Sequence, residues 1–394
     1  MTAGKESLVS LVQNQLGQDG DVVRALTEVV MRALMEEEVT AHVGAGLHER
    51  TSNRQGRRNG YKPRKLKTRL GELELSVPQV RGTEPYQPSF LNKFQRSERA
   101  LLAACAEMYF MGVSTRKVGQ VLEKMGGFEV SASTVSRVAA ELDEQLTPFR
   151  ERRLDDRQWP YLMVDATYVK VRRHGRVLST AVLVVAGIDH SGKREILSWR
   201  PGDNESEETW GQLFRELKAR GLNGMELLVS DAHKGIRSAL ARYLSGAAWQ
   251  RCRVHFMRNG LALLGGSKDK KTAGRELSQL FKLGDKAACR MAAEEMAARW
   301  EKKVPGLARL IREGFEDCLT VHDLEPRLVR KLHSTNMLER VNREIKRRTE
   351  VVGIFPNEAS CDRLIGAHLL ERQEQWLCEA KRYVIPPERA DAAE

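Results

Sequence analysis

The chain has 394 residues, enough for two or three domains with their own cores, and it carries a net charge of +12 at a pI near 9.5. This charge suits a polyanionic partner, although a basic protein without one fits the total equally well. No stretch approaches the roughly 20 apolar residues of a membrane span, and the N-terminus lacks the apolar core of a signal peptide, so we expect neither a membrane protein nor a secreted one.

Cysteine usage indicates the compartment. The six cysteines are scattered along the chain and never form a CxxC pair. In a basic chain of this length they are typical of reduced thiols, so we expect a cytoplasmic protein.

Residues 1–48 are expected to form a helical region. Apolar side chains repeat at four-residue spacing from Leu8 to Leu16, and a second stripe runs from Val22 to Leu34. A helical unit of this kind could bind DNA or pair with a second subunit, and the pattern does not choose between them.

A basic arm follows within residues 49–90. From Arg50 to Arg69 there are nine Lys or Arg and no Asp or Glu. Such a block is usually solvated or disordered, but acid-free basic arms also follow DNA phosphates well. We expect a short β segment over 65–82 and then a proline-containing linker. The candidate DNA contacts of the arm are Arg57, Arg58, Lys62, Arg64 and Lys65.

Residues 91–150 have the pattern of a helix-turn-helix-like DNA-binding domain. Helices are expected over 97–111, 114–125 and 130–146, with glycines between them. Hydroxyl side chains and an arginine at the start of the third helix suit entry into a major groove. An ordinary three-helix bundle with serine caps is the alternative. The candidate DNA contacts here are Ser133, Ser136 and Arg137.

The most regular pattern begins after a linker over 147–160. Three β segments joined by two tight turns predict an antiparallel meander, and helix, strand, helix and a probable strand follow. The expected strands are 161–171, 176–188, 194–200, 225–230 and 247–256, and the expected helices are 205–221 and 233–244. This is the ribonuclease H order. A doubly wound nucleotide-binding fold is weaker, because neither its β–α–β start nor a glycine-rich phosphate loop is present.

We therefore predict an α/β fold class, with a ribonuclease-H-like mixed-sheet catalytic core preceded by helical N-terminal DNA-binding domains. The core occupies 157–256, an α-helical insertion follows over 257–332, and final helices over 333–384 complete the core before a tail over 385–394. Within the insertion, we expect residues 265–276 to form a basic loop.

Two aspartates of the core are candidate catalytic residues. Asp165 lies within the apolar strand YLMVDATYV, where an unpaired carboxylate costs several kcal/mol unless it is paired or bound to metal. Asp231 ends a buried strand, where ligands gather in open α/β sheets. An aspartate that caps the helix at His233 is a competing explanation for Asp231.

The third acid is chosen from Glu339, Glu344 and Glu350 on a helix within 334–357. Glu339 shares a polar helix face with an asparagine and two bases, which can hold an ion and a DNA phosphate together. The members of this face are Asn336, Glu339, Arg343 and Lys346. Glu344 lies near several arginines, where a surface salt bridge is sufficient explanation. We therefore prefer Glu339.

Three converging carboxylates suit phosphodiester chemistry with two Mg²⁺ (or Mn²⁺) ions per active site, since these hard ions take oxygen ligands. The segments VDATYVKVR, VSDAHKGI, QRCRVHFMRN and TNMLERVNREIKRRTEVVGIFPNE resemble those of bacterial insertion-sequence transposases of the IS256 (Mutator-like) family. The resemblance extends from the basic arm to Pro356. It implies that Asp165, Asp231 and Glu339 are the catalytic, metal-binding triad, and that Lys346 contacts transposon-end DNA.

The resemblance also places the family's Cys-x2-His pair on Cys252 and His255. Two ligands do not make a zinc site, so we interpret the pair as packing or DNA contact. His233 could orient a water or touch a phosphate, although a helix-cap role is about as plausible. Arg343, Arg347 and Arg348 with Lys346 form a basic strip that is expected to line the DNA groove, with a solvated face as the alternative.

The implied function is a DDE transposase. Water activated at the triad nicks the end of the insertion sequence, and the freed 3′-hydroxyl attacks another phosphodiester. The expected partners are double-stranded DNA, as terminal inverted repeats and target, and a second copy of the chain in a homodimer; the expected location is cytoplasmic and nucleoid-associated. The alternatives are a ribonuclease-H-like nuclease without strand transfer and a non-catalytic DNA-binding regulator.

Overall fold

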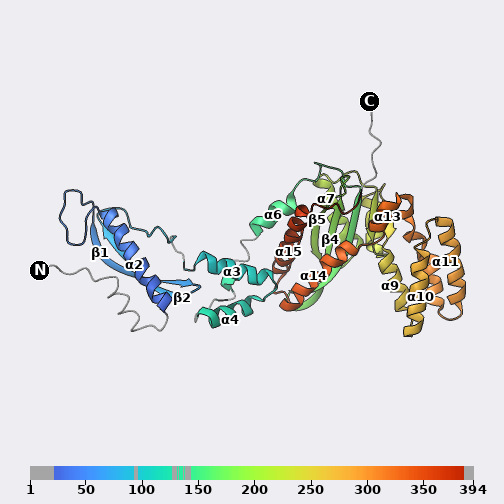
Figure 1. The fold of residues 1–394 in the computed structure, drawn as a ribbon, viewed down its shortest axis with the longest axis horizontal. Helices are drawn as coiled ribbons and strands as arrows, with labels where there is room; N and C mark the ends of the chain where they lie inside the picture. The colour runs from blue at the N-terminus through green and yellow to red at the C-terminus, as the bar shows by residue number, and fades with distance from the viewer. Residues whose placement is uncertain are drawn as a thin grey trace, which may run out of the picture. The chain divides into compact units, whose positions relative to one another are not determined.

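The structure is a computed structural model that describes residues 22–92, 96–126, 131, 133–135, 137 and 143–385 (Figure 1). The chain divides into two compact units, residues 1–140 and 141–394. Among the described helices, none combines the length and the apolar character needed to cross a membrane.

The first unit is built on helix α2 (Val22–Val43) and a hairpin of strands β1 (Arg57–Thr68) and β2 (Gly71–Arg81). The hairpin and α2 share one apolar cluster, in which Met35 packs with Leu73 and their neighbours. The expected short β segment over 65–82 is therefore too short, because β1 takes in the basic arm from Arg57. Pairing along β2 supplies the backbone hydrogen bonds of the arm, which local composition does not reveal. The part of the expected N-terminal helices before residue 22 lies outside the described residues.

Two helices follow in the first unit, α3 (Arg99–Phe110) and α4 (Thr115–Gly126), close to the first two expected over 91–150. Of the expected third helix, the structure describes only residues 131, 133–135, 137 and 143–146. Ser136 lies outside the described residues.

The second unit begins with α6 (Asp143–Glu151), which extends into the segment expected to be a linker. The helix continues because it has an apolar face to bury: Leu146 and Phe149 are buried, and the Phe149 ring stacks on Trp199 with centroids 5.4 Å apart. The linker prediction is wrong for residues 147–151.

A five-stranded mixed sheet lies at the centre of the second unit. Its strands are β3 (Tyr161–Arg173), β4 (Arg176–Ile188), β5 (Arg194–Gly202), β6 (Leu227–Ser230) and β7 (Ala248–Arg251). The order is β5-β4-β3-β6-β7, with β3, β4 and β5 antiparallel and with β6 and β7 running parallel to β3. The β3–β4 turn places His174 and Gly175 at positive φ, 47° and 76°, as a two-residue hairpin turn requires.

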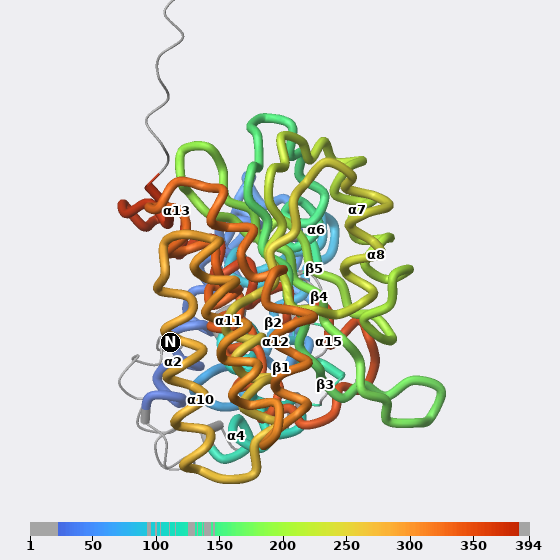
Figure 2. The backbone as a smooth tube through the Cα atoms, turned by 90° about the vertical axis from the view of Figure 1, so that its right-hand side faces the viewer, coloured from blue at the N-terminus to red at the C-terminus, as the bar shows by residue number. Residues whose placement is uncertain are grey.

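Helices cover both faces of this sheet (Figures 1 and 2). Along β3, Leu162 and Val164 pack into one cluster with Trp210 and Phe214 of α7 (Glu207–Ala219) and with α8 (Lys234–Tyr243). Successive side chains of a strand alternate between faces, so Asp165 points to the opposite side. There lie α14 (Asn336–Val352) and α15 (Glu358–Cys378), which contact β3 and β5.

The helical insertion forms a second apolar core between β7 and α14. Figure 2 shows α10, α11 and α12 side by side. Its elements are α9 (Arg253–Ala262), α10 (Ser267–Leu280), α11 (Lys286–Glu301), α12 (Pro305–Gly314), two short 3-10 turns (Glu316–Cys318 and Thr320–Asp323) and α13 (Pro326–Leu332).

Two expectations about the boundaries of the insertion are wrong. Residues 267–276 of the expected loop over 265–276 are helical and belong to α10, because Ala273 and Leu277 are buried on one face of this helix. The expected strand over 247–256 ends at Arg251, where the parallel partner β6 also ends, and α9 begins two residues later.

Candidate active site

The register of the parallel strands aligns two of the predicted acids. Met163 of β3 lies beside Val229 of β6, so two positions farther along these parallel strands Asp231 follows beside Asp165. Neighbouring strands lie about 4.8 Å apart, and side chains paired across a parallel sheet point to the same face. The same register continues into β7, since Ser230 pairs with Arg251 and the Cys252 amide donates to the Ser230 carbonyl at 2.6 Å. Asp165, Asp231 and Cys252 therefore lie in one line across three strands.

Asp165 is a buried carboxylate with few partners. Its Oδ2 accepts a hydrogen bond from Asn342 Nδ2 of α14 at 2.9 Å, and its Oδ1 accepts from the Ala166 amide at 3.0 Å. Burial, together with the charge of Asp231, raises the pKa of Asp165 to about 6, while His255 and the two hydrogen bonds oppose the rise. The cost of burying an ionised Asp165 is thus only partly offset by its neighbours.

Asp231 is held at the start of α8. Its Oδ1 accepts from the His233 amide at 3.1 Å, and His233 itself is the N-cap, with Nδ1 accepting from the Gly235 amide at 3.3 Å. The helix-cap role that competed for Asp231 is therefore filled by His233. Gly235 allows a close approach here, because a Cβ at this position would lie 2.2 Å from the Glu205 carbonyl oxygen.

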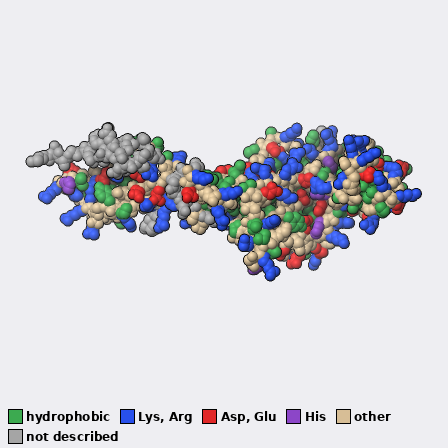
Figure 3. Space-filling model, turned by 90° about the horizontal axis from the view of Figure 1, so that it is seen from below, with side chains coloured by type: hydrophobic (Ala, Val, Ile, Leu, Met, Phe, Trp, Pro, Cys, Tyr) green, Lys and Arg blue, Asp and Glu red, His purple; other side chains and the backbone are tan. Residues whose placement is uncertain are grey.

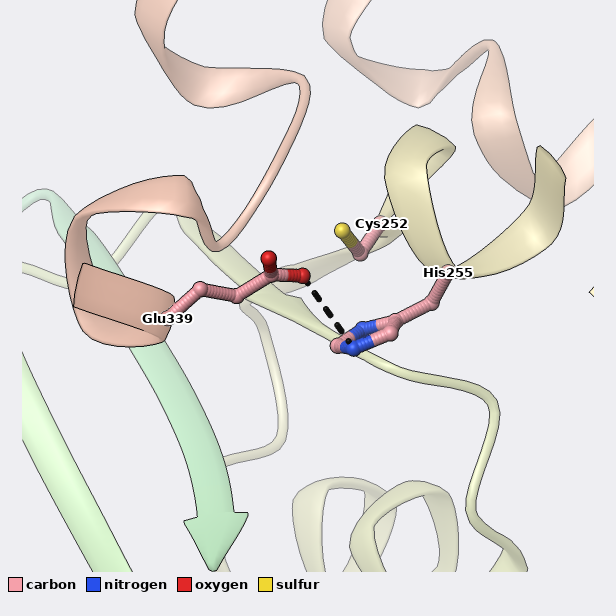
Figure 4. Close-up of side chains that lie close together, drawn as sticks. All are labelled: Cys252, His255 and Glu339. Atoms are coloured by element: carbon pink, nitrogen blue, oxygen red, sulfur yellow. Dashed lines mark ion pairs between the residues drawn. The ribbon is translucent and has the colours of Figure 1, made fainter. Parts of the chain in front are cut away.

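Glu339 lies in the first turn of α14 and contacts two residues of α9. Figure 4 shows its carboxylate facing His255, and Oε1 lies 3.3 Å from His255 Nε2. Arg258 of α9 donates to both carboxylate oxygens, at 3.2 and 3.3 Å. We call Asp165, Asp231 and Glu339 the acidic cluster; His255 bridges it, because it contacts Glu339 and lies close enough to Asp165 to change its pKa.

Cys252 anchors the start of α14. It is fully buried, and its Sγ accepts from the Thr335 amide at 3.4 Å and from Thr335 Oγ1 at 3.5 Å. Of the two roles predicted for Cys252, burial excludes DNA contact and leaves packing. The Cys252 sulfur raises the pKa of His255 to about 9 against the effect of burial, with Asp165 and Glu339 adding to the rise.

Among the described residues, one group of three side chains lies close enough together to hold a metal ion. The ligand atoms of Cys252, His255 and Glu339 all lie within 4.8 Å of one another (Figure 4). The carboxylate oxygens of Asp165, Asp231 and Glu339 suit a hard ion such as Mg²⁺, but within the described part of the chain these three do not form such a group in this structure.

The site also contains residues that the sequence did not single out. Glu205 is buried, accepts from the Tyr168 hydroxyl at 2.8 Å, and has its pKa raised by burial and by the nearby charge of Asp231. No local pattern marks it, since it precedes a helix among other acids. Asn342 had a detectable signal: it is a polar side chain beside the apolar positions of α14, three residues after Glu339.

The basic strip of α14 is divided by burial. Arg343 and Lys346 are exposed on the face of Glu339, as is Asn336 at the first position of the helix. Arg347 is exposed and pairs with Glu344, and this hydrogen bond together with one from Arg348 lowers the pKa of Glu344 to about 2. Arg348 is buried and also pairs with Glu371 at 2.8 Å, so the prediction that it lines a DNA groove is wrong: its charge is used within the protein.

The side chains of the first unit that were predicted to contact DNA also differ, because some are already bound to other groups of the protein. Arg58 pairs with Glu36 at 2.7 Å, Lys65 pairs with Glu72 at 2.7 Å, and Arg64 donates to the Asn92 carbonyl at 2.8 Å. Arg57, Lys62, Ser133 and Arg137 are exposed, and so is Lys65 despite its ion pair. Figure 3 shows the same mixture, with acids lying among the bases on the visible face.

The chain is similar to known proteins along nearly its whole length. Residues 1–379 match the family model described as "Transposase, Mutator family". The chain is 43% identical to the transposase for insertion sequence element ISRM5 of Rhizobium meliloti, covering 97% of this chain and 95% of that one. It is 37% identical to the transposase for IS256 in transposon Tn4001 of Staphylococcus aureus, covering 97% of each.

Among solved structures, the chain is similar to the Drosophila P element transposase strand transfer complex over 73% of its length and 82% of that chain. At 11% identity and a TM-score of 0.28, this likeness is too weak to define the fold. The family match and the relatives cover nearly the whole chain, and it therefore belongs to the Mutator family of transposases.

Proposed function

We propose that this transposase binds the ends of its insertion sequence, hydrolyses a phosphodiester there with the help of divalent metal, and transfers the freed 3′-hydroxyl to another phosphodiester. Two observations support the proposal: the strand register brings Asp231, directly after β6, beside Asp165 of β3, and His255, which lies close to Asp165, contacts Glu339 of α14. A non-catalytic DNA-binding regulator would have no use for a buried carboxylate held at this cost.

We further propose that the second unit is a ribonuclease-H-like core with a helical insertion. The strand order β5-β4-β3-β6-β7 supports this, as does the antiparallel β3–β4–β5 meander followed by two parallel strands. Helices on both faces leave the ends of β6 and β7 as the place where ligands collect.

Asp165, Asp231 and Glu339 would hold two Mg²⁺ or Mn²⁺ ions. When bound, such a pair activates the attacking oxygen and neutralises charge at the leaving oxygen. The protein's own part is to fix the ligands: Asn342 orients Asp165, and the His233 amide orients Asp231. Arg258 and His255 hold Glu339 and keep positive charge beside the scissile phosphate.

The proposed DNA contacts are the exposed bases. Arg343 and Lys346 lie on the same helix face as Glu339 and would follow the phosphates next to the cleaved bond. In the first unit we retain the exposed Arg57, Lys62, Ser133 and Arg137. We also propose that two copies of the chain pair the two ends of the element as a homodimer.

One assay tests the reaction. The protein is incubated with terminal-repeat DNA and a target plasmid, in Mg²⁺ or in EDTA. Loss of metal ligation removes several kcal/mol of transition-state stabilisation, so Glu339→Gln should reduce joined products by about 10³-fold. Glu350→Gln, the same change at an exposed position of the same helix, should leave them unchanged.

The rivals give different results in this assay. Cleavage without joining would favour a nuclease that lacks strand transfer. DNA binding that is indifferent to metal, with no cleavage, would favour a regulator. Joining that persists in EDTA would refute the metal-dependent mechanism.

A further inference from the structure

A cavity of about 460 Å³ lies in the helical insertion, apart from the acidic cluster. It opens to solvent and is lined by residues of α9, the end of α10, α13 and the second 3-10 turn. We call it the insertion pocket. Its volume falls in the range of about 300–1,000 Å³ that is typical of small-molecule sites.

The charge of the insertion pocket is of one sign. Arg253, Lys282 and Arg330 line it together with His322 and His333, and of the described residues that line it none is Asp or Glu. Lys282 and Arg330 are exposed, whereas Arg253 is 5% exposed. A cavity that gathers cations without acids is complementary to an anion.

Arg253 has a buried hydrogen-bond donor that lacks an acceptor. Its Nε donates to the Cys318 carbonyl at 3.1 Å, and its guanidinium lies over the Phe281 ring at 4.8 Å. Its Nη2 is buried and finds no hydrogen-bond partner among the described residues, and the same holds for His322 Nε2. A buried donor without an acceptor is costly, and a planar guanidinium can donate two parallel hydrogen bonds to two oxygens of a phosphate.

The remaining wall of the insertion pocket is apolar. Met257, Leu324 and Val329 line it, and Phe281 contributes an aromatic ring. Inorganic phosphate alone would leave this surface without a partner, whereas a sugar and base would cover it. Phosphate recognition beside an apolar and aromatic wall is the chemistry that suits a nucleotide.

We propose that the insertion pocket binds the phosphate of a nucleotide, with Arg253 as the buried anchor, Lys282 and Arg330 as exposed contacts, and Phe281 against the sugar or base. The nucleotide is either a free mononucleotide or part of bound DNA, since both present the same group. The proposal does not depend on the roles of the acidic cluster, because its tests measure binding alone.

The first experiment uses equilibrium dialysis of the full-length protein against labelled deoxyadenosine 5′-monophosphate. Binding is expected, with deoxyadenosine at least about tenfold weaker because it lacks the charged acceptor. The double variant Lys282→Gln/Arg330→Gln should weaken binding about tenfold. Lys302→Gln/Arg309→Gln removes the same charge from exposed positions of the insertion outside the pocket and should leave the affinity unchanged.

A second experiment identifies DNA as the source. The affinity for a terminal-repeat duplex is measured at several salt concentrations. If the nucleotide belongs to DNA, the pocket variant should lower affinity and reduce the salt slope by about two relative to the control variant, and the mononucleotide should not bind. The proposal is overturned if neither mononucleotide binding nor duplex binding differs between the pocket variant and its control.

Discussion

The acidic cluster and the basic strand β1 are both dense in charge, but the charged groups differ in burial and in pairing. Asp165, Asp231 and Glu339 come from distant parts of the chain, yet the register aligns the two aspartates, His255 lies close to both Asp165 and Glu339, and burial raises the pKa of Asp165. The bases of β1 are neighbours in sequence, yet Arg58 and Lys65 are paired with acids of the same unit. Charge density along a sequence is therefore a poorer guide to function than the cost of burying one charged group.

The largest expected effect is on Asp165. Its pKa of about 6, against an ordinary value of 3.8, corresponds to up to about 3 kcal/mol of stability that is present below pH 4 and lost as pH rises through 6. Asp165→Asn should therefore raise the melting temperature measured in EDTA at pH 8, and it should abolish the DNA cleavage measured in Mg²⁺. The exposed Asp323→Asn should do neither. A variant at Asp165 that is destabilised at pH 8 would contradict an uncompensated charge there.

The pH dependence of cleavage sharpens the same point. Because Asp165 must lose its proton to bind metal, the single-turnover rate should fall about tenfold per pH unit below about pH 6. Raising the Mg²⁺ concentration should move this fall to lower pH, since cation and proton compete for one carboxylate. A rate that stays level down to pH 5 at low Mg²⁺ would show that Asp165 is not a ligand.

A substitution at Cys252 tests whether the packing of its sulfur against Thr335 helps to position Glu339. Cys252→Ala removes the contacts of the sulfur with Thr335, so α14 and Glu339 should shift and cleavage should fall about tenfold. Cys361→Ala also removes a fully buried sulfur, but from α15, and should lower the melting temperature without this loss of rate. Equal effects of the two changes on cleavage would mean that the Cys252 contact has no special role.

The smallest effects are expected in the basic strand. Lys62→Gln should weaken DNA binding about threefold and reduce the salt slope by about one, with the melting temperature unchanged, because Lys62 is exposed. Arg58→Gln breaks a half-buried ion pair with Glu36 and should destabilise the first unit by about 1 kcal/mol. If both variants changed DNA affinity equally and stability not at all, the contrast between paired and available bases would fail.

Most strands and helices of the second unit could be predicted from the sequence, but several residues around the candidate site could not. All five strands were expected, because β-forming residues and tight turns leave local marks, and the apolar spacing of α14 placed Glu339 on a polar face. The contribution of Glu205 and the start of α9 at Arg253 depend on contacts between distant segments, for which local spacing gives no signal. The same reason hides the pairing of β1, whose partners lie on α2 and β2.

The insertion leaves and re-enters the core at a single point. The Arg253 amide donates to the His333 carbonyl at 3.0 Å, and Thr335 contacts the Cys252 sulfur directly behind it. A segment whose two ends already touch can change in length at modest cost to the core. Exchanging α10, α11 and α12 for those of a relative, with α9 kept because its His255 and Arg258 contact Glu339, should therefore leave the sheet intact, which makes these helices a natural place to graft new specificity onto the enzyme.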